Sequence, residues 1–158
     1  MKGERGTIRH PLKASQQIDY SGVRYGNATP SDIDGMLELR DKLFIFFEFK
    51  DTNAQPLTGG QRIALQRIAD AISKGGKKAI VIIGEHNTPV GQDIRADQSL
   101  VLEVRWEGRW HDIKNKKLTV KQCTDEAYSI AFDDNQEQPI FAVHKTAQHN
   151  MTLSDLIG

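Results

Sequence analysis

Two apolar runs separated by three polar residues constrain the fold of this chain more than any other feature. The runs span residues 33–39 and 43–49, the second reading LFIFFEF, and the triplet Arg-Asp-Lys at 40–42 lies between them. Short runs rich in branched and aromatic residues around a polar triplet predict a β-hairpin. A turn that pairs Leu39 with Leu43 fixes the whole register, because one pair determines all the others.

This register brings two carboxylates together. Asp34 faces Glu48 at a Cβ separation of roughly 5 Å, and Lys50 projects from the same face. Adjacent carboxylates repel each other, so a strand pair that keeps them is expected to bind a counter-charge. Mg²⁺ fits because it prefers oxygen ligands and takes one or two carboxylates. Asp32 has the same strand parity as Asp34. It is therefore either a competing metal ligand or a salt-bridge partner of Lys50. In other sheets such a pattern is only a solvated face or a simple ion pair.

An amphipathic helix and a buried strand follow the hairpin. Residues 59–74 (GGQRIALQRIADAISK) carry an apolar stripe of helical period before Gly75-Gly76. Gln61 begins that stripe, four residues before Leu65, and therefore points toward the sheet. There it either joins the carboxylates or bonds backbone amides at the helix terminus. Residues 79–83 (AIVII) are apolar on both faces, as in a buried parallel strand. The class is α/β, with a mixed central sheet flanked by helices.

The other expected elements are less strongly patterned. They are a short helix at 12–20, a hairpin from 100–106 and 109–113 that turns at Glu107-Gly108, a strand at 118–123, a capped helix at 124–132 and a last strand at 139–144. Residues 1–11 are expected to form a mobile basic arm. Residues 12–158 then make a single domain.

Several basic and aromatic residues are candidates for nucleic-acid contacts. The basic ones, which could equally well serve only as solvated surface, are Arg62, Arg67, Lys114, Lys116, Lys117 and Lys121. Trp106 and Trp110 have arginine neighbours and form either a base-stacking platform or a half-buried hairpin face. His144 and His149 lie five residues apart, a spacing that does not favour joint metal ligation.

Composition excludes few function classes. The 21 basic and 21 acidic side chains balance, which argues against a strong non-specific grip on nucleic acid. The single Cys123 fits a reducing compartment. No apolar stretch approaches the length of a membrane span and no leader opens the chain, so we expect a soluble, cytoplasmic protein without a membrane partner.

Asp34, the Glu48-Phe49-Lys50 triplet and Gln61 at the start of a helix resemble the PD-(D/E)XK nuclease superfamily. That group includes restriction endonucleases, archaeal Holliday junction resolvases and RecB-type nuclease domains. The resemblance covers roughly residues 15–85, with the motif core at 30–85, and it implies a restriction endonuclease-like core. It also implies that Asp34, Glu48 and the Phe49 backbone carbonyl bind Mg²⁺, for which Mn²⁺ substitutes. Lys50 would position the water or stabilise the phosphate, with Gln61 beside it.

The implied activity is that of a Mg-dependent phosphodiesterase, a hydrolase that cleaves nucleic acid by attack of a Mg-activated water. DNA is favoured over RNA, and the resemblance is compatible with a homodimer or a larger assembly. On this hypothesis Glu48→Ala or Lys50→Ala abolishes cleavage, and Glu48→Ala raises stability by removing like-charge repulsion. An alternative is a catalytically inactive nucleic-acid-binding or assembly module on the same fold. A third is a hydrolase of small phosphoesters.

Overall fold

The computed structural model describes residues 17–52, 59–133 and 141. The chain divides into two compact units, Met1–Asp32 and Ile33–Gly158. In the first unit, an isolated antiparallel bridge joins Tyr25 to Ala28. The predicted arm at 1–11 lies outside the described residues, as does most of the predicted strand at 139–144. Of the predicted helix at 12–20 only residues 17–20 are described, and they are not helical.

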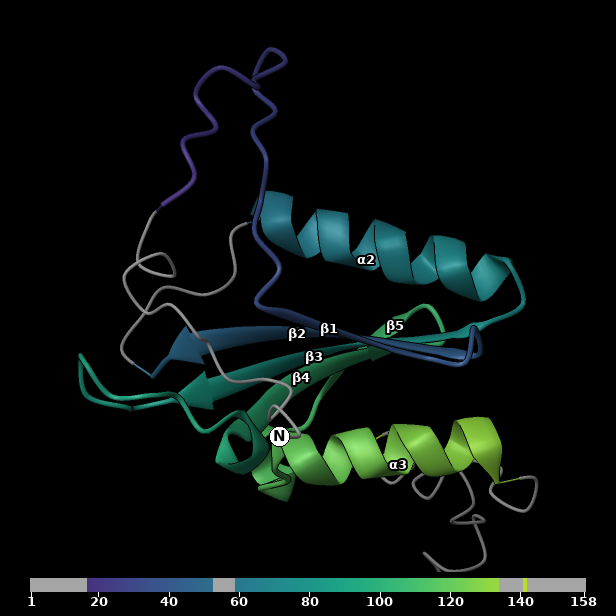
Figure 1. The fold of residues 1–158 in the computed structure, drawn as a ribbon. Helices are drawn as coiled ribbons and strands as arrows, with labels where there is room; N and C mark the ends of the chain where they lie inside the picture. The colour runs from purple at the N-terminus through teal and green to yellow at the C-terminus, as the bar shows by residue number, and fades with distance from the viewer. Residues whose placement is uncertain (1–16, 53–58, 134–140, 142–158) are drawn as a thin grey trace, which may run out of the picture. The chain divides into compact units, whose positions relative to one another are not determined.

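The second unit is a five-stranded mixed sheet with one long helix on each face (Figure 1). The strands follow one another across the sheet in chain order, and only β2 and β3 run parallel. Their bounds are β1 Gly35–Leu39, β2 Leu43–Asp51, β3 Lys78–His86, β4 Leu100–Trp106 and β5 Arg109–Asp112. Helix α2 is Gly59–Lys74 and helix α3 is Val120–Phe132, with short 3₁₀ turns η1 at Ala96–Gln98 and η2 at Lys114–Lys116. The predicted α/β class is confirmed.

The β1–β2 hairpin has the predicted register. Leu39 pairs with Leu43, and each earlier residue of β1 pairs in step with a later residue of β2. Arg40 and Asp41 both adopt a left-handed backbone with φ of 55°, which is how two right-twisted strands join through a tight turn. The ladder ends at Gly35 opposite Phe47. The ladder therefore stops one pair short of Asp34 and Glu48.

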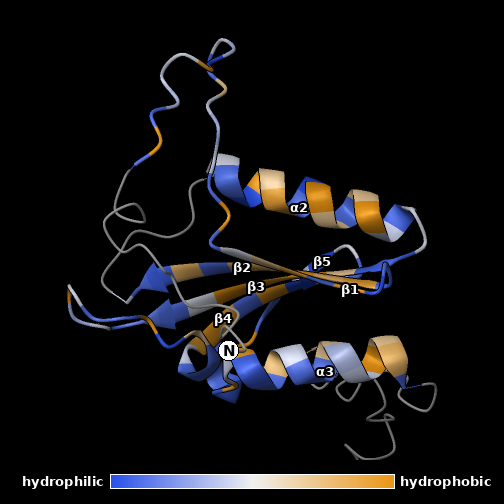
Figure 2. Ribbon diagram, in the orientation of Figure 1, coloured by the Kyte–Doolittle hydropathy of each residue, from blue (hydrophilic) through white to orange (hydrophobic). Residues whose placement is uncertain are grey.

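Helix α2 connects β2 to its parallel neighbour β3, and its bounds are those predicted. Its buried residues Leu65 and Ala69 pack on the even-numbered side chains of β2 and the odd-numbered side chains of β3, as in the contact with Phe46 and Val81. Strand β3 continues past the apolar run into Glu85 and His86. Hydrophilic residues accordingly gather at the C-terminal ends of both strands (Figure 2).

Helix α3 begins earlier than predicted, and the strand expected at 118–123 is wrong. Thr119 caps the helix: its hydroxyl accepts the Gln122 backbone N–H, and the Gln122 side chain accepts the Thr119 N–H. This reciprocal capping box starts a helix at Val120. The buried face of α3, including Cys123 and Ala127, packs on the opposite side of the sheet from α2.

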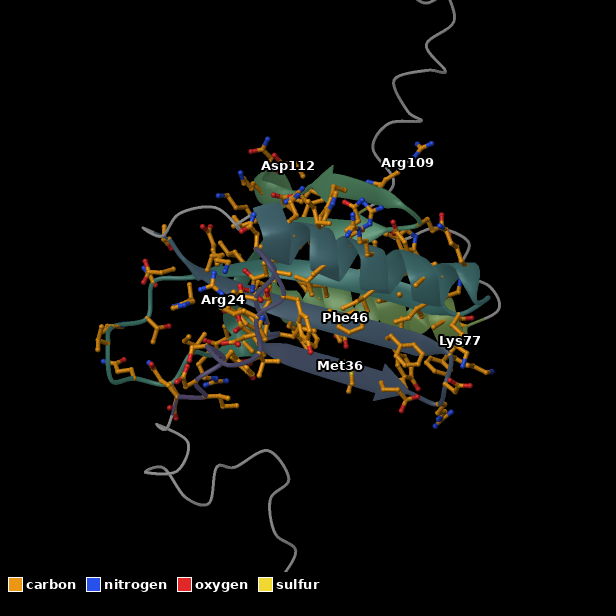
Figure 3. The ribbon with its side chains drawn as sticks, turned by 90° about the horizontal axis from the view of Figure 1, so that it is seen from above. Arg24, Met36, Phe46, Lys77, Arg109 and Asp112 are labelled. Atoms are coloured by element: carbon orange, nitrogen blue, oxygen red, sulfur yellow. The ribbon has the colours of Figure 1, made fainter. Side chains whose placement is uncertain are left out.

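The edges of the sheet differ in their cover. The β4–β5 hairpin turns at Glu107 and Gly108, both with positive φ, as predicted. At the other edge, Met36 of β1 lies beside Phe46 of β2 but outside the span of α2 (Figure 3), and 61% of its surface is exposed. Among the described residues, no helix combines the length and apolar character needed to cross a membrane.

Candidate functional site

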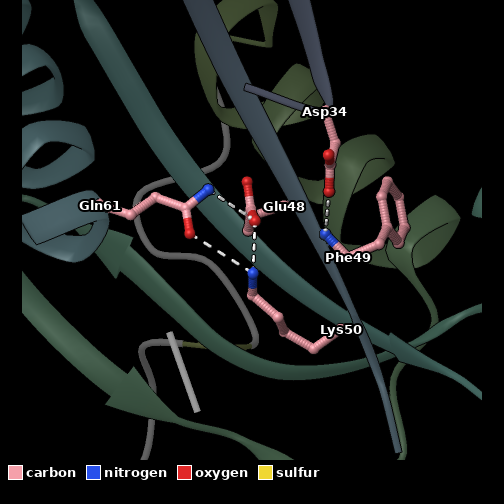
Figure 4. Close-up of polar contacts among 5 residues, drawn as sticks. All are labelled: Asp34, Glu48, Phe49, Lys50 and Gln61. Carbon is pink, nitrogen blue, oxygen red and sulfur yellow. Dashed lines mark hydrogen bonds and ion pairs between the residues drawn. The ribbon is translucent and has the colours of Figure 1, made fainter. Parts of the chain in front are cut away.

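Three polar side chains meet where β2 ends beneath the start of α2. Glu48 and Lys50 have the parity of the β2 residues that face α2, and Gln61 lies in the first turn of that helix. Gln61 points to the sheet because it precedes Leu65 by one helical turn, as its place in the apolar stripe predicted. The crossover from β2 to β3 thus holds the glutamine over the strand that carries the other two residues (Figure 4).

Glu48 is buried, with 2% of its surface exposed. Its Oε1 accepts hydrogen bonds from Lys50 Nζ at 2.6 Å and from Gln61 Nε2 at 2.8 Å. Lys50 Nζ also lies 3.4 Å from Gln61 Oε1, so the three side chains form a closed ring of contacts. The other carboxylate oxygen, Oε2, is buried and has no hydrogen-bond partner among the described residues. A buried carboxylate oxygen without a partner is costly, which makes it a ready ligand for a cation.

The neighbours of Glu48 change the expected effect of removing it. The Glu48 carboxylate accepts hydrogen bonds from the Lys50 ammonium and the Gln61 amide. The register alone had suggested that its neighbour would be the Asp34 carboxylate. Loss of the carboxylate would leave Lys50 without this ion pair and open space under α2. We therefore expect Glu48→Ala to lower stability, the reverse of the expectation from sequence.

Asp34 reaches the same end of β2 in a different way from that predicted. Its Oδ2 accepts the backbone N–H of Phe49 at 2.7 Å. Phe49 is two residues beyond Phe47, whose pair with Gly35 is the last of the ladder, so its N–H points to the same edge. In a longer ladder the Phe49 N–H would donate to a backbone carbonyl of the β1 strand. Here it donates to the Asp34 carboxylate instead. The Phe49 carbonyl points to the same side of β2 as its N–H.

Asp32, the competing ligand, has a different setting from Asp34. It is exposed and belongs to the first compact unit, and the β1–β2 ladder ends before reaching it.

A polar cavity of about 590 Å³ opens at the C-terminal ends of β2 and β3. Its lining includes Thr52, Glu85 and His86. Glu85 is the register partner of Lys50 across the parallel pair, so the cavity begins next to the polar ring. Space for a polar ligand therefore adjoins the site.

The predicted basic residues lie in two places, on α2 and in the segment from η2 to the start of α3. Arg62 pairs with Glu103 at 2.6 Å, and its guanidinium lies 3.9 Å from the centroid of the Trp110 ring. Arg67 is exposed on α2. Lys116 is half-buried, and burial lowers the pKa of its ammonium. The remaining three, all exposed near the start of α3, are Lys114, Lys117 and Lys121, the last of which pairs with Asp125.

The two tryptophans are not a joint base-stacking platform. Trp106 is buried in the core, edge-on to Phe141 at 5.7 Å between ring centroids. Trp110 lies beneath Arg62 and donates its indole N–H to Gln66 Oε1 at 3.1 Å. The sequence left open whether the tryptophans form a platform or a half-buried hairpin face. In the structure Trp106 is buried in the core, and Trp110 is half-buried against α2.

Sequence reasoning missed a second charged contact under α2. Arg105, only 6% exposed, binds both carboxylate oxygens of Asp70 at 2.8 and 2.7 Å. The bond from Arg105 lowers the pKa of Asp70. A pattern in the helix sequence could have predicted this contact, because polar side chains recur every four residues on one flank, at Arg62, Gln66 and Asp70. Their contacts with β4 and β5 fix the helix that carries Gln61.

The candidate donors at this end of β2 are oxygens, which are the ligands that Mg²⁺ prefers. Glu48 offers the partnerless Oε2, and Asp34 and the Phe49 carbonyl lie at the adjoining edge of β2. Within the described ranges, no group of three or more His, Cys, Asp and Glu side chains could enclose a metal. A hard cation that keeps several waters needs no such cage. His144 and His149 lie outside the described residues.

Comparisons with protein-family models, with curated proteins and with solved structures give no match. The argument for function therefore depends on the geometry of this site.

Proposed function

We propose that the protein is a magnesium-dependent nuclease that hydrolyses phosphodiester bonds, with DNA as the favoured substrate. The observation that carries the proposal is the buried Glu48 carboxylate, with one oxygen held by Lys50 and Gln61 and the other without a described partner. A carboxylate that only stabilised the fold would be expected to have both oxygens bonded. Membership of the PD-(D/E)XK nucleases is part of the proposal.

Each residue of the site has a role that its contacts support. Glu48 Oε2, Asp34 and the Phe49 carbonyl would hold Mg²⁺, which when bound lowers the pKa of water and offsets charge on the phosphate. Lys50 is held at a fixed place by two oxygens and can direct its ammonium to a non-bridging phosphate oxygen or to the attacking water. Gln61 orients both Glu48 and Lys50, so it is a positioning residue.

The alternative is a binding or assembly module that keeps the ring of contacts but does not cut. The closed Glu48–Lys50–Gln61 ring favours it, because these bonds stabilise the fold without any metal. The two functions differ in one property that is measured directly. A nuclease gains stability from Mg²⁺ or Mn²⁺ and cuts nucleic acid, whereas the module does neither.

The test is cleavage of labelled single-stranded, duplex and four-way-junction DNA in Mg²⁺, Mn²⁺ or EDTA. We expect metal-dependent cutting that falls about 100-fold or more in Lys50→Ala and Asp34→Asn. Glu38→Gln is a matched control, since the Glu38 carboxylate, like that of Asp34, accepts a backbone N–H, and it lies at the opposite end of the hairpin. Cutting that persists in both site variants at the wild-type rate would overturn the site. Absence of metal-dependent cutting by the wild-type protein would favour the module.

A further inference from the structure

A second cavity, on the face of the sheet that packs on α3, opens beside Asp34. Its volume is about 310 Å³, and its lining includes Phe47 and Phe49 of β2 with Val120, Lys121 and Thr124 of α3. Asp34 belongs to the same lining. The cavity therefore begins at a proposed metal ligand, and what it binds bears on what the site cuts.

Two glycines leave room for the residues of this cavity. Gly35 belongs to the lining, and a Cβ built on it would lie 3.4 Å from Phe47 Cδ2, so a larger side chain there would project beside that ring. A Cβ on Gly84 would lie 3.1 Å from the Phe49 ring and from Val120 Cγ2. The absence of a side chain at Gly84 therefore lets Phe49 and Val120, which both line the cavity, pack closely against β3.

One wall of the cavity is aromatic. The rings of Phe47 and Phe49 are inclined by only 13°, with centroids 6.5 Å apart, and both residues are half-buried. Half-buried aromatic rings on a sheet face are suited to stacking with a planar apolar group. A nucleobase is such a group, and stacking on aromatic side chains is how proteins bind single-stranded nucleic acid without reading its sequence.

Three charged side chains belong to the lining of the cavity: Lys121, Asp34 and Asp97. Asp97 pairs with Arg95, and Asp34 is the carboxylate that the proposed function assigns to metal binding. Lys121 pairs with Asp125, but the two side chains are 62% and 61% exposed, so this pair contributes little and can exchange for a phosphate. The cavity therefore offers an apolar wall for a base and one exchangeable cation for a phosphate, beside the Asp34 carboxylate.

We propose that this cavity binds one unstacked nucleobase and thereby selects single-stranded, frayed or branched nucleic acid. The inference rests on the proposed function and names its substrate class. A base inside a duplex is covered on both faces by its neighbours, so it cannot stack on Phe47 or Phe49 unless it leaves the helix. Lys121 would hold the flanking phosphate, and the next phosphodiester would lie toward Asp34.

The test measures binding in EDTA, where cleavage cannot occur, by fluorescence anisotropy. The probes are labelled dT₂₀ and rU₂₀, a 20-nucleotide oligomer of abasic sites, and a 20-base-pair duplex. We expect the wild-type protein to bind the base-bearing strands about tenfold more tightly than the abasic strand or the duplex. Gly35→Val, which places a branched side chain beside the Phe47 ring, and Phe47→Leu, which removes a ring, should each remove most of that preference. Lys121→Ala should weaken binding of all probes, whereas Lys74→Ala, at the exposed end of α2, should not.

Stabilisation by Mn²⁺ serves as the fold and site control, since Gly35→Val and Phe47→Leu should keep it. Equal affinity for abasic and base-bearing strands, or an unchanged preference in Gly35→Val with its Mn²⁺ response intact, would overturn the inference. Cleavage separates the two proposals. A wild-type protein that cuts but shows no base preference refutes the cavity alone. One that prefers unstacked bases but never cuts refutes nuclease activity while supporting base binding.

Discussion

Replacement of Glu48 by glutamine separates the structural from the metal-binding role of this residue. Glutamine keeps the shape and the hydrogen-bonding length of the side chain but removes its charge. The carboxylate side chain is 3% exposed and its partner Lys50 is 23% exposed. The substitution therefore acts on a nearly buried anion whose counter-ion retains some access to water.

These contacts determine how much unfolding free energy Glu48→Gln loses in the absence of metal. Breaking a fully buried ion pair costs about 3–5 kcal/mol, because the remaining charge is left uncompensated. Here Lys50 reaches water, and the new amide still bonds Gln61, so the loss reduces to about 1–2 kcal/mol. For a chain of this size that corresponds to a fall in Tm of about 2–8 °C.

Mn²⁺ should increase the difference in unfolding free energy between the wild-type protein and Glu48→Gln. A ligand that binds only the folded state adds about 1.4 kcal/mol at ten times its Kd and about 2.7 kcal/mol at one hundred times its Kd. The wild-type protein should gain this amount, whereas Glu48→Gln lacks the anionic Oε2 and should gain little. The stability gap between them then grows from about 1–2 kcal/mol in EDTA to about 4–5 kcal/mol at a Mn²⁺ concentration one hundred times its Kd.

The assay is urea unfolding in EDTA and across a MnCl₂ titration. Glu103→Gln is the matched control, because Glu103 is also an ion-paired glutamate, with a side chain 27% exposed, whose partner Arg62 lies on α2. It should lose stability yet keep the full Mn²⁺ response. Equal Mn²⁺ stabilisation of Glu48→Gln and wild type would refute the assignment of Glu48 as a ligand. A gain of stability by Glu48→Gln in EDTA would instead refute the role given to Lys50 and Gln61.

Two further predictions concern the core that supports the site. Asp70→Asn should destabilise the fold by about 3 kcal/mol, because it removes the counter-charge of the buried Arg105, and urea unfolding measures this directly. Because the Arg105 bond lowers the pKa of Asp70 below its ordinary 3.8, its contribution is present above that pH and is lost as the pH falls further. The wild-type protein should thus lose stability below about pH 4 more steeply than Asp70→Asn, and parallel pH profiles would contradict this. Burial raises the pKa of Cys123 to about 12, so its thiol should not react with Ellman's reagent at pH 8 until urea unfolds the chain. Rapid reaction of the folded protein would show that α3 is not packed as described.

The hairpin and the β2–α2–β3 crossover were predictable from the sequence because local patterns determine them. The triplet at 40–42 allowed a single turn that kept both apolar runs paired, and the helix bounds follow from its stripe and the glycines after it. The expectation of a strand at 118–123 was wrong, since a helix begins at Val120. The capping box at Thr119 and Gln122 was the stronger local signal.

The site was predicted in composition but not in arrangement. Strand parity correctly directs Glu48 and Lys50 to the helix, and the place of Gln61 in the apolar stripe brings it to both. The position of Asp34 could not be obtained by extending the register, because the end of a ladder depends on which carbonyl or carboxylate takes the last free amide. In this protein Asp34 takes it.

Local sequence patterns were enough to predict the hairpin and its register, the β2–α2–β3 order and the residue types at the end of β2, since these depend on near neighbours and on the periods of strand and helix. Three features came from tertiary packing: the single bonded oxygen of Glu48, whose other oxygen has no partner among the described residues, the contact of Arg105 with Asp70 across 35 residues, and the aromatic cavity beside Asp34. Those features arise between segments distant in the chain. Their geometry is set by how helices and strands pack, which no local pattern specifies.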